Sequence, residues 1–314
     1  MWSHLRLTVL HVEYRAERRC RLPAYKGSML RGSLGHALRD MACFEPGGPC
    51  GRCPNTDRCA AGALFEPQEA GEVAARFDRP MPYIVTAPPD RREAYAAGEG
   101  LAFTLSLVGS GRVWLPWVVG ALASMGQRGL GAERAPFVLS RVCVEAPAGQ
   151  RTPLDLPGRG VGPGVGELDG ASLVAAQPPS ERVVLHFVTP TDLRRKGHQA
   201  EQLDGALLVS RLLRRLGGLL QTYCRWSADG FDFKAVVDEA SGMACRDLSL
   251  EFREWERYSV RRGGRHRLSG LVGRVELGSV PARLWPYLVV GERTHVGKGA
   301  SFGMGQYVLE APQA

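Results

Sequence analysis

The chain has 314 residues, of which 44% are hydrophobic and 23% are charged, a composition typical of soluble globular proteins. This length is sufficient for two domains that each bury a core, whereas the longest apolar runs are too short to cross a bilayer. A membrane-spanning protein is thereby excluded, and the first residues lack the apolar core of a signal peptide, so we expect a cytoplasmic protein with no membrane partner. The formal net charge of +8 is compatible with an anionic partner.

A strand and a helix are predicted at the start of the chain. Residues 5–14 alternate in the way that a strand with one buried face does. A helix is predicted from about Ser28, which can serve as its N-cap, to Met41, because apolar residues recur there at helical spacing. His36 lies on this helix between two leucines. A lone histidine in a helix is more often structural than catalytic, so both roles stay open on this pattern.

A cluster of cysteines follows the helix and gives the most specific chemical signal in the sequence. Its four members lie within 17 residues, with prolines and glycines that favour turns between them: Cys43, Cys50, Cys53 and Cys59. Four thiolates can complete a tetrahedral zinc site, and the Cys-x-x-Cys pair is the usual two-ligand turn. We therefore expect a structural zinc ion, because four cysteines leave no open position for a catalytic one. An iron–sulfur cluster is the alternative, although the spacing matches no common ferredoxin pattern.

The remaining elements of the first domain come at the spacing of a compact α+β unit. Strands are predicted at about residues 80–88 and 101–108, a helix at 115–125 and a strand at 137–144. Together with the first strand and helix, the order is βαββαβ, which is the ferredoxin-like split unit. We therefore expect a first domain over residues 1–145, with the cysteine loop at 43–66 inserted in it.

A second domain is predicted to repeat this order. Residues 146–181 are rich in glycine and proline and are expected to form a linker. The second domain should cover residues 182–314, with these elements at about 183–188 (strand), 202–224 (helix), 248–258 and 268–277 (hairpin), 282–290 (helix) and 306–309 (strand). Three basic residues follow its first strand, Arg194, Arg195 and Lys196. The predicted fold is α+β, with two tandem ferredoxin-like (RRM-like) domains.

The tip of the predicted hairpin is strongly basic. Gly263 and Gly264 are a turn signal between two strands, and five basic residues surround them: Arg261, Arg262, Arg265, His266 and Arg267. Exposed hairpin tips are often charged for solubility alone. A tip with no acidic residue is less usual, and arginines on a stiff ribbon suit the phosphates and guanine edges of an RNA stem, so we predict RNA contact here.

A glycine-rich run lies near the end of the chain. Its candidate contact residues fall within nine positions: Gly297, Lys298, Gly299, Ser301, Phe302, Gly303 and Gly305. Glycine at this density lets the backbone turn sharply and approach another molecule closely. The pattern fits either a flexible surface loop or a loop whose N–H groups contact phosphate. It is neither a Walker A loop nor a dinucleotide fingerprint, because the required spacing or the following helix is missing.

This run resembles the C-terminal glycine-rich signature of the CRISPR-associated RAMP superfamily, and within it the endoribonucleases that process precursor CRISPR RNA. Two further segments are similar to that family at the same points, YKGSMLRGSLGHALRDMAC at residues 25–43 and TPTDLRRKG at residues 189–197. The resemblance implies a general base or acid on or just before the first helix. It therefore makes His36 the candidate base or acid, and Tyr25 and Lys26 the candidates that orient and neutralise the phosphate.

The resulting prediction is a metal-independent endoribonuclease that binds the repeat of precursor CRISPR RNA and cuts it once per repeat. The 2′-hydroxyl would attack the adjacent phosphorus and leave 2′,3′-cyclic phosphate and 5′-hydroxyl ends, which requires a base, an acid and a cation. The enzyme would stay bound to the mature RNA together with other effector-complex subunits. Two alternatives remain, a non-catalytic RNA-binding subunit of such a complex and an iron–sulfur protein with an incidental basic surface.

Overall fold

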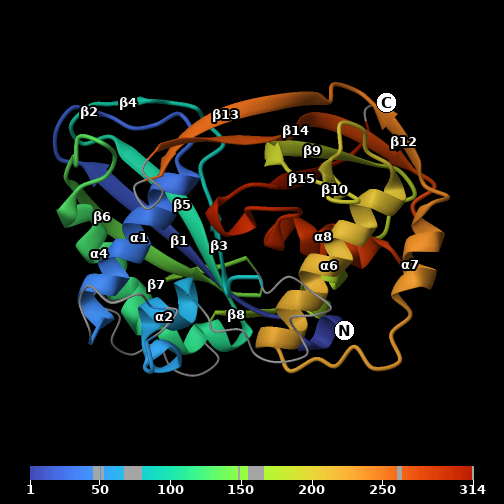
Figure 1. Ribbon diagram of the computed structural model, residues 1–314, viewed down its shortest axis with the longest axis horizontal. Coiled ribbons are helices and arrows are strands. Elements are labelled where there is room, and N and C mark those ends of the chain that lie inside the picture. Colours follow the sequence, from blue (N-terminus) through green and yellow to red (C-terminus); the bar gives the residue numbers. More distant parts are fainter. Residues whose placement is uncertain are drawn as a thin grey trace.

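The protein contains two antiparallel sheets that lie side by side, each covered by helices (Figure 1). The computed structural model describes residues 1–44, 50, 53–66, 80–147, 149–154, 166–259 and 264–312. The mixed α/β class predicted from the sequence is confirmed, with the first sheet built before residue 170 and the second after residue 182. None of the helices in the described part of the chain combines the length and the apolar character that crossing a membrane requires.

The first sheet has the strand order β3-β5-β1-β6-β7, and β8 also pairs with β1. Its strands are β1 (Arg6–Ala16), β3 (Tyr83–Thr86), β5 (Gly100–Val108), β6 (Phe137–Glu145), β7 (Arg151–Pro153) and β8 (Glu167–Asp169). A separate pair is formed by β2 (Cys20–Arg21) and β4 (Ala94–Tyr95). The order of β3, β5, β1 and β6 is consistent with the predicted βαββαβ unit, in which the first strand lies between the third and the fourth.

Two helices, α1 (Gly27–Ala42) and α4 (Leu115–Arg128), pack against each other over this sheet. The apolar residues of α1 recur at helical spacing, and Leu30, Leu34 and Leu38 are buried in the first core. The predicted N-cap is wrong by two residues. The helix begins at Gly27 after Lys26, and Ser28 lies in its first turn. The cysteine segment contributes η3 (Thr56–Arg58) and α2 (Ala60–Phe65), and η4 (Gly109–Trp114) precedes α4.

The second sheet has the order β12-β14-β9-β15, and β13 also pairs with β14. Its strands are β9 (Val183–Thr191), β12 (Ala244–Asp247), β13 (Glu251–Ser259), β14 (Gly264–Gly278) and β15 (Tyr307–Glu310). The predicted hairpin is confirmed, because β13 and β14 pair from Glu251 with Val272 to Ser259 with Gly264. This ribbon is long and crosses the top of the molecule toward the first domain (Figure 1).

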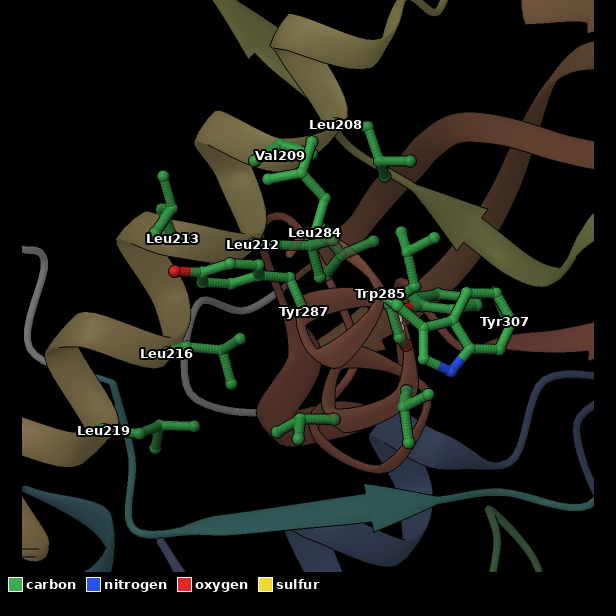
Figure 2. Packing of buried hydrophobic residues seen from close by; sticks show 14 of the residues in the cluster. Leu208, Val209, Leu212, Leu213, Leu216, Leu219, Leu284, Trp285, Tyr287 and Tyr307 are labelled. Atoms are coloured by element: carbon green, nitrogen blue, oxygen red, sulfur yellow. Dashed lines mark hydrogen bonds between the residues drawn. The ribbon is translucent and has the colours of Figure 1, made fainter. Parts of the chain in front are cut away.

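The helices of the second domain are α6 (Gly205–Tyr223), α7 (Phe233–Ala240) and α8 (Trp285–Thr294). The Asp204 side chain caps α6 by accepting a hydrogen bond of 2.8 Å from the Leu207 N–H. The leucines of α6 pack beside α8 and Tyr307 in one continuous core (Figure 2). The Tyr307 hydroxyl donates to the Leu288 carbonyl at 2.5 Å, which joins α8 to the edge strand β15. The remaining short elements are η1 (Trp2–His4), β10 (Arg194–Arg195), β11 (His198–Gln199) and η5 (Ala300–Phe302).

The segment predicted as a linker, residues 146–181, contains regular structure. Besides β7 and β8, it forms α5 (Gly170–Ala175), which Asp169 caps by accepting from the Ser172 N–H. Strand β8 pairs with β1, whereas α5 packs on α8 of the second domain. The indole of Trp285 in α8 also donates to the Gln177 carbonyl at 2.8 Å. This segment therefore contacts both domains.

Candidate active site at the domain joint

The glycine-rich run lies between the two domains. Gly297, Gly299, Gly303 and Gly305 have φ values of +80°, +81°, +88° and +70°, which glycine adopts without strain. Between them, η5 packs against α1 and β3 of the first domain. The Tyr25 hydroxyl donates to the Phe302 carbonyl, and a methyl group on Gly27 would come 2.1 Å from that carbonyl oxygen. The run is thus a closely packed joint at the start of α1.

Aromatic side chains bring the β13–β14 ribbon to the same place. The ring of Trp255 from β13 lies 5.1 Å from that of Tyr25, centroid to centroid. The Arg91 guanidinium also contacts Trp255 and lies 5.0 Å from the centroid of its ring. Three segments that are distant in the sequence therefore meet here: the start of α1, the loop before β4 and the ribbon.

Arg31 is a cation of this site that the sequence reasoning missed. Its Nε donates to the Tyr83 hydroxyl at 3.1 Å, and its guanidinium lies 5.2 Å from the Phe65 ring centroid. Burial raises the pKa of Tyr83 to about 12, against the opposing effects of Arg31 and of a hydrogen bond with Ser301. Arg31 is therefore held next to the glycine-rich run. The sequence could have indicated Arg31, because it lies one turn inside the helix and within the motif that resembles the processing family.

The three predicted catalytic side chains are not brought together. Tyr25 lies at the joint, but the Lys26 side chain is fully buried, with Nζ 3.4 Å from Asp90 Oδ1. Burial lowers the pKa of Lys26, and Asp90 opposes that effect. In this arrangement the Lys26 ammonium does not reach a phosphate at the surface. His36 is exposed and lies ten residues further along α1, about 15 Å along the helix axis.

The basic residues after β9 lie beside the glycine-rich run. The Lys298 N–H donates to the Asp192 carbonyl at 3.1 Å, and the Asp192 carboxylate pairs with Arg194 at 3.1 Å. Arg195 pairs with Asp204, whereas Lys196 is exposed at a positive φ of 51°. Two of these three cations are thus already paired with carboxylates on the protein.

Only part of the basic hairpin tip is described. Arg261 and Arg262 lie outside the described residues, as do the side chains of Arg265 and His266. Arg267 is exposed, and its guanidinium lies 3.1 Å from Glu254 on the facing strand. The prediction of RNA contact at this tip stays a prediction.

A buried polar cluster underlies the joint. His295 is 1% exposed, its Nε2 lies 3.0 Å from Thr86 Oγ1 of β3, and its backbone φ is +60°. The half-buried Arg215 of α6 donates to the Thr294 carbonyl at 2.6 Å. Burial, and then the charge of Arg215, lowers the pKa of His295 to about 3. His295 is therefore neutral at pH 7 and connects the two domains.

The buried His295 predicts a loss of stability in acid. As the pH falls below the unfolded pKa of about 6.5, the unfolded chain takes up a proton that the folded chain refuses until about pH 3. At pH 5 this effect amounts to about 2 kcal/mol. Asparagine tolerates positive φ and does not titrate. We therefore expect the His295→Asn variant to lose less stability than the wild type when the pH is lowered from 7.5 to 5. Urea unfolding at both pH values checks this, and equal losses in the two proteins would refute it.

The four clustered cysteines lie at the far end of α1. Cys43 is the C-cap of that helix, and all four line one cavity of about 20 Å³: Cys43, Cys50, Cys53 and Cys59. In the described part of the chain, no three His, Cys, Asp or Glu side chains are already placed to coordinate a metal ion. The cluster is therefore gathered in space but distinct from the joint.

Comparisons with known proteins agree with the two-part fold. Residues 185–307 match the model of the family described as CRISPR-associated endoribonuclease Cas6, and residues 5–160 match a separate model described as an N-terminal domain. An uncharacterised protein of Archaeoglobus fulgidus is 23% identical over 298 residues, which cover 92% of this chain and 93% of that protein.

Solved structures share the fold over nearly the whole chain. A Cas6 product complex is 21% identical with a TM-score of 0.54, and the match covers 98% of this chain and 100% of that one. Thermus thermophilus Cas6 is 15% identical with a TM-score of 0.55, and the match covers 97% and 98% of the two chains. The family model therefore matches residues 185–307 to the Cas6 family of CRISPR-associated endoribonucleases, and the solved structures show that the whole chain has a fold similar to that of Cas6.

Proposed function

We propose that this protein binds the repeat of precursor CRISPR RNA and cuts it once per repeat at the domain joint. The observation that carries this proposal is the packing of the glycine-rich run on the start of α1, next to Tyr25 and Arg31. Among the described residues no side chain caps α1, so the N–H groups of its first turn can meet a phosphate. Arg31 supplies a planar cation that suits phosphate oxygens.

The chemistry that fits this site is attack by the neighbouring ribose. A bond forms between the 2′-oxygen and phosphorus, the bond from phosphorus to the 5′-oxygen breaks, and the products carry a 2′,3′-cyclic phosphate and a 5′-hydroxyl. A base accepts the 2′-proton, and an acid gives a proton to the leaving oxygen. We assign Arg31 to the charge on the phosphorane, and His36 to the base or the acid. The two residues are five positions apart on α1, about 7.5 Å along its axis and about 140° around it, so the imidazole reaches the phosphate at Arg31 only if RNA binding shifts one of the two side chains.

Tyr25 is assigned a positioning role at the same phosphate. Its hydroxyl contacts the Phe302 carbonyl, and its ring is packed against Trp255, so its orientation is fixed from two sides. A tyrosine held in this way can orient the leaving oxygen. None of these steps needs a metal ion, because the nucleophile belongs to the substrate.

Basic surfaces on both sides of the joint are assigned to RNA binding. Lys196 and Lys298 are exposed close to the glycine-rich run, and the tip of the β13–β14 ribbon adds arginines in the sequence. Such contacts hold the phosphates of an RNA stem. We propose that the mature RNA stays bound after cleavage, that other effector subunits join this complex, and that it forms in the cytoplasm, where the transcript is made.

The proposal predicts cleavage of a repeat-containing transcript in the presence of EDTA. The 5′ product should carry a 2′,3′-cyclic phosphate, which mass spectrometry of the purified fragment detects. A matched transcript with one 2′-deoxy nucleotide just upstream of the scissile phosphate lacks the nucleophile and should stay intact. Cleavage of that transcript would mean that water attacks, and the mechanism would be wrong.

A non-catalytic RNA-binding subunit is the second candidate, and one observation favours it. Of the predicted catalytic residues, Lys26 is fully buried and paired with Asp90. If the protein binds the repeat tightly in a filter or gel-shift assay and cuts no transcript under any tested condition, this second function replaces the first.

A further inference from the structure

The four cysteines after α1 line one small cavity. Cys43 ends α1, Cys59 begins α2, and the two remaining members, Cys50 and Cys53, occupy the turn between those helices. All four are free thiols. The cavity measures about 20 Å³, which is about the space that one water molecule or one ion occupies.

Hydrogen bonds fix the turn that carries the middle pair. The Cys53 N–H donates to the Cys50 carbonyl at 3.1 Å. The buried Thr56 hydroxyl lies 2.5 Å from the Cys50 carbonyl oxygen and 2.7 Å from that of Cys53. Gly62 of α2 fits against Thr56, because a methyl group there would come 2.4 Å from the Thr56 carbonyl oxygen. Both cysteines held by these hydrogen bonds line the cavity.

The four cysteines line the same cavity, and thiolates gathered around one cavity repel each other unless a cation lies among them. Four thiolates are the ligands that a structural zinc ion takes, and they leave no position for water or substrate.

We propose that Cys43, Cys50, Cys53 and Cys59 bind one structural Zn²⁺ ion. Zinc suits the small cavity better than an iron–sulfur cluster, which contains several metal and sulfide atoms. Because no three donors in the described part of the chain are already in coordinating positions, binding must draw the sulfurs toward the cavity centre. Burial of the metal then contributes folding free energy to the segment between α1 and α2.

This site would act on the joint through α2, an extension that rests on the proposed function. Phe65 at the end of α2 stacks on Tyr83 with ring centroids 4.8 Å apart. The same ring lies under the Arg31 guanidinium and against Gly35 of α1, where a methyl group would come 2.8 Å from it. A fixed α2 therefore holds Arg31 and Tyr83 in place, so zinc has a positioning role and no part in the chemistry.

Metal analysis of the whole protein tests the site independently of any RNA. Protein purified without chelator should contain about one zinc per chain by mass spectrometry with inductively coupled plasma. Cys53→Ser should lose most of it, whereas Cys245→Ser, which changes a cysteine of β12 outside the cluster, should keep it. If Cys53→Ser fails to fold, the wild type loaded with Co²⁺ decides, because four thiolates give intense sulfur-to-cobalt absorption.

Wild-type protein without stoichiometric zinc, or with iron and visible colour instead, would overturn the proposal, as would an unchanged zinc content in Cys53→Ser. The link to the joint has its own readout. Phe65→Ala should keep its zinc and bind RNA normally, yet cut more slowly. Full zinc with no cleavage in the wild type would reject the proposed function and leave the metal site standing.

Discussion

Replacing His36 by alanine is expected to slow cleavage of the repeat RNA by roughly a hundred- to ten-thousand-fold, which is what a general acid or base usually contributes. The affinity for RNA should change little, because one exposed imidazole makes at most one of many contacts. Single-turnover rates at saturating enzyme, together with equilibrium binding, measure the two effects separately.

His4→Ala serves as the control, since it removes an exposed imidazole from η1 and should leave the rate unchanged. His36→Ala could instead cut at the full rate while the 2′-deoxy transcript still resists cleavage. That result would support attack by the 2′-hydroxyl. The assignment of the residue would then be wrong, and Tyr25→Phe, which loses only the hydroxyl at the Phe302 carbonyl, would be the next variant to measure.

Replacing Gly305 by alanine should destabilise the fold by about 3 kcal/mol or more. Its φ is +70°, and a methyl group would lie 1.7 Å from the Val296 carbonyl oxygen. The side chain therefore meets both a disfavoured backbone conformation and a backbone atom that cannot give way. Urea unfolding monitored by tryptophan fluorescence measures the loss.

Gly32→Ala is the matched control, and its expected effect on the stability of the fold is the opposite one. Gly32 lies inside α1, and a methyl group there meets nothing within 4 Å. Alanine should therefore stabilise the helix by about 0.5–1 kcal/mol. If Gly305→Ala is as stable as the wild type, the glycine-rich run is not the packed joint described above, and its role in holding η5 against α1 would have to be abandoned.

Side-chain periodicity was enough to predict most of the elements. The strand predicted at residues 183–188 is β9, and the helix predicted at 202–224 is α6, because both have a strict apolar pattern on the buried side. The strand in fact continues to Thr191 through Pro190. This extension lies where the pairing of β9 with β14 is irregular. Such an irregularity depends on the partner strand, so the local sequence Thr-Pro-Thr does not predict it.

The missed elements and site residues depend on contacts between distant segments. Helix α7 is short, although the Asp232 cap that accepts from the Ala235 N–H was a readable signal. The burial of Lys26 depends on Asp90, and the placement of Arg31 depends on Tyr83. Asp90 and Tyr83 are both far from α1 in the sequence. The motif that resembles the family could therefore identify the helix, but it could not show which of its side chains face the joint.

The hydrogen bond from Tyr25 to Phe302 joins residues that are 277 positions apart. A ribosome that adds 5–20 residues per second needs on the order of 15 to 55 s to make the intervening chain. During that time the start of α1 has no η5 to pack against, and Trp255 reaches it well before Phe302 does. On a nascent chain the joint is therefore incomplete until residue 302 has been made, so under the proposed function translation delays the onset of RNA cutting.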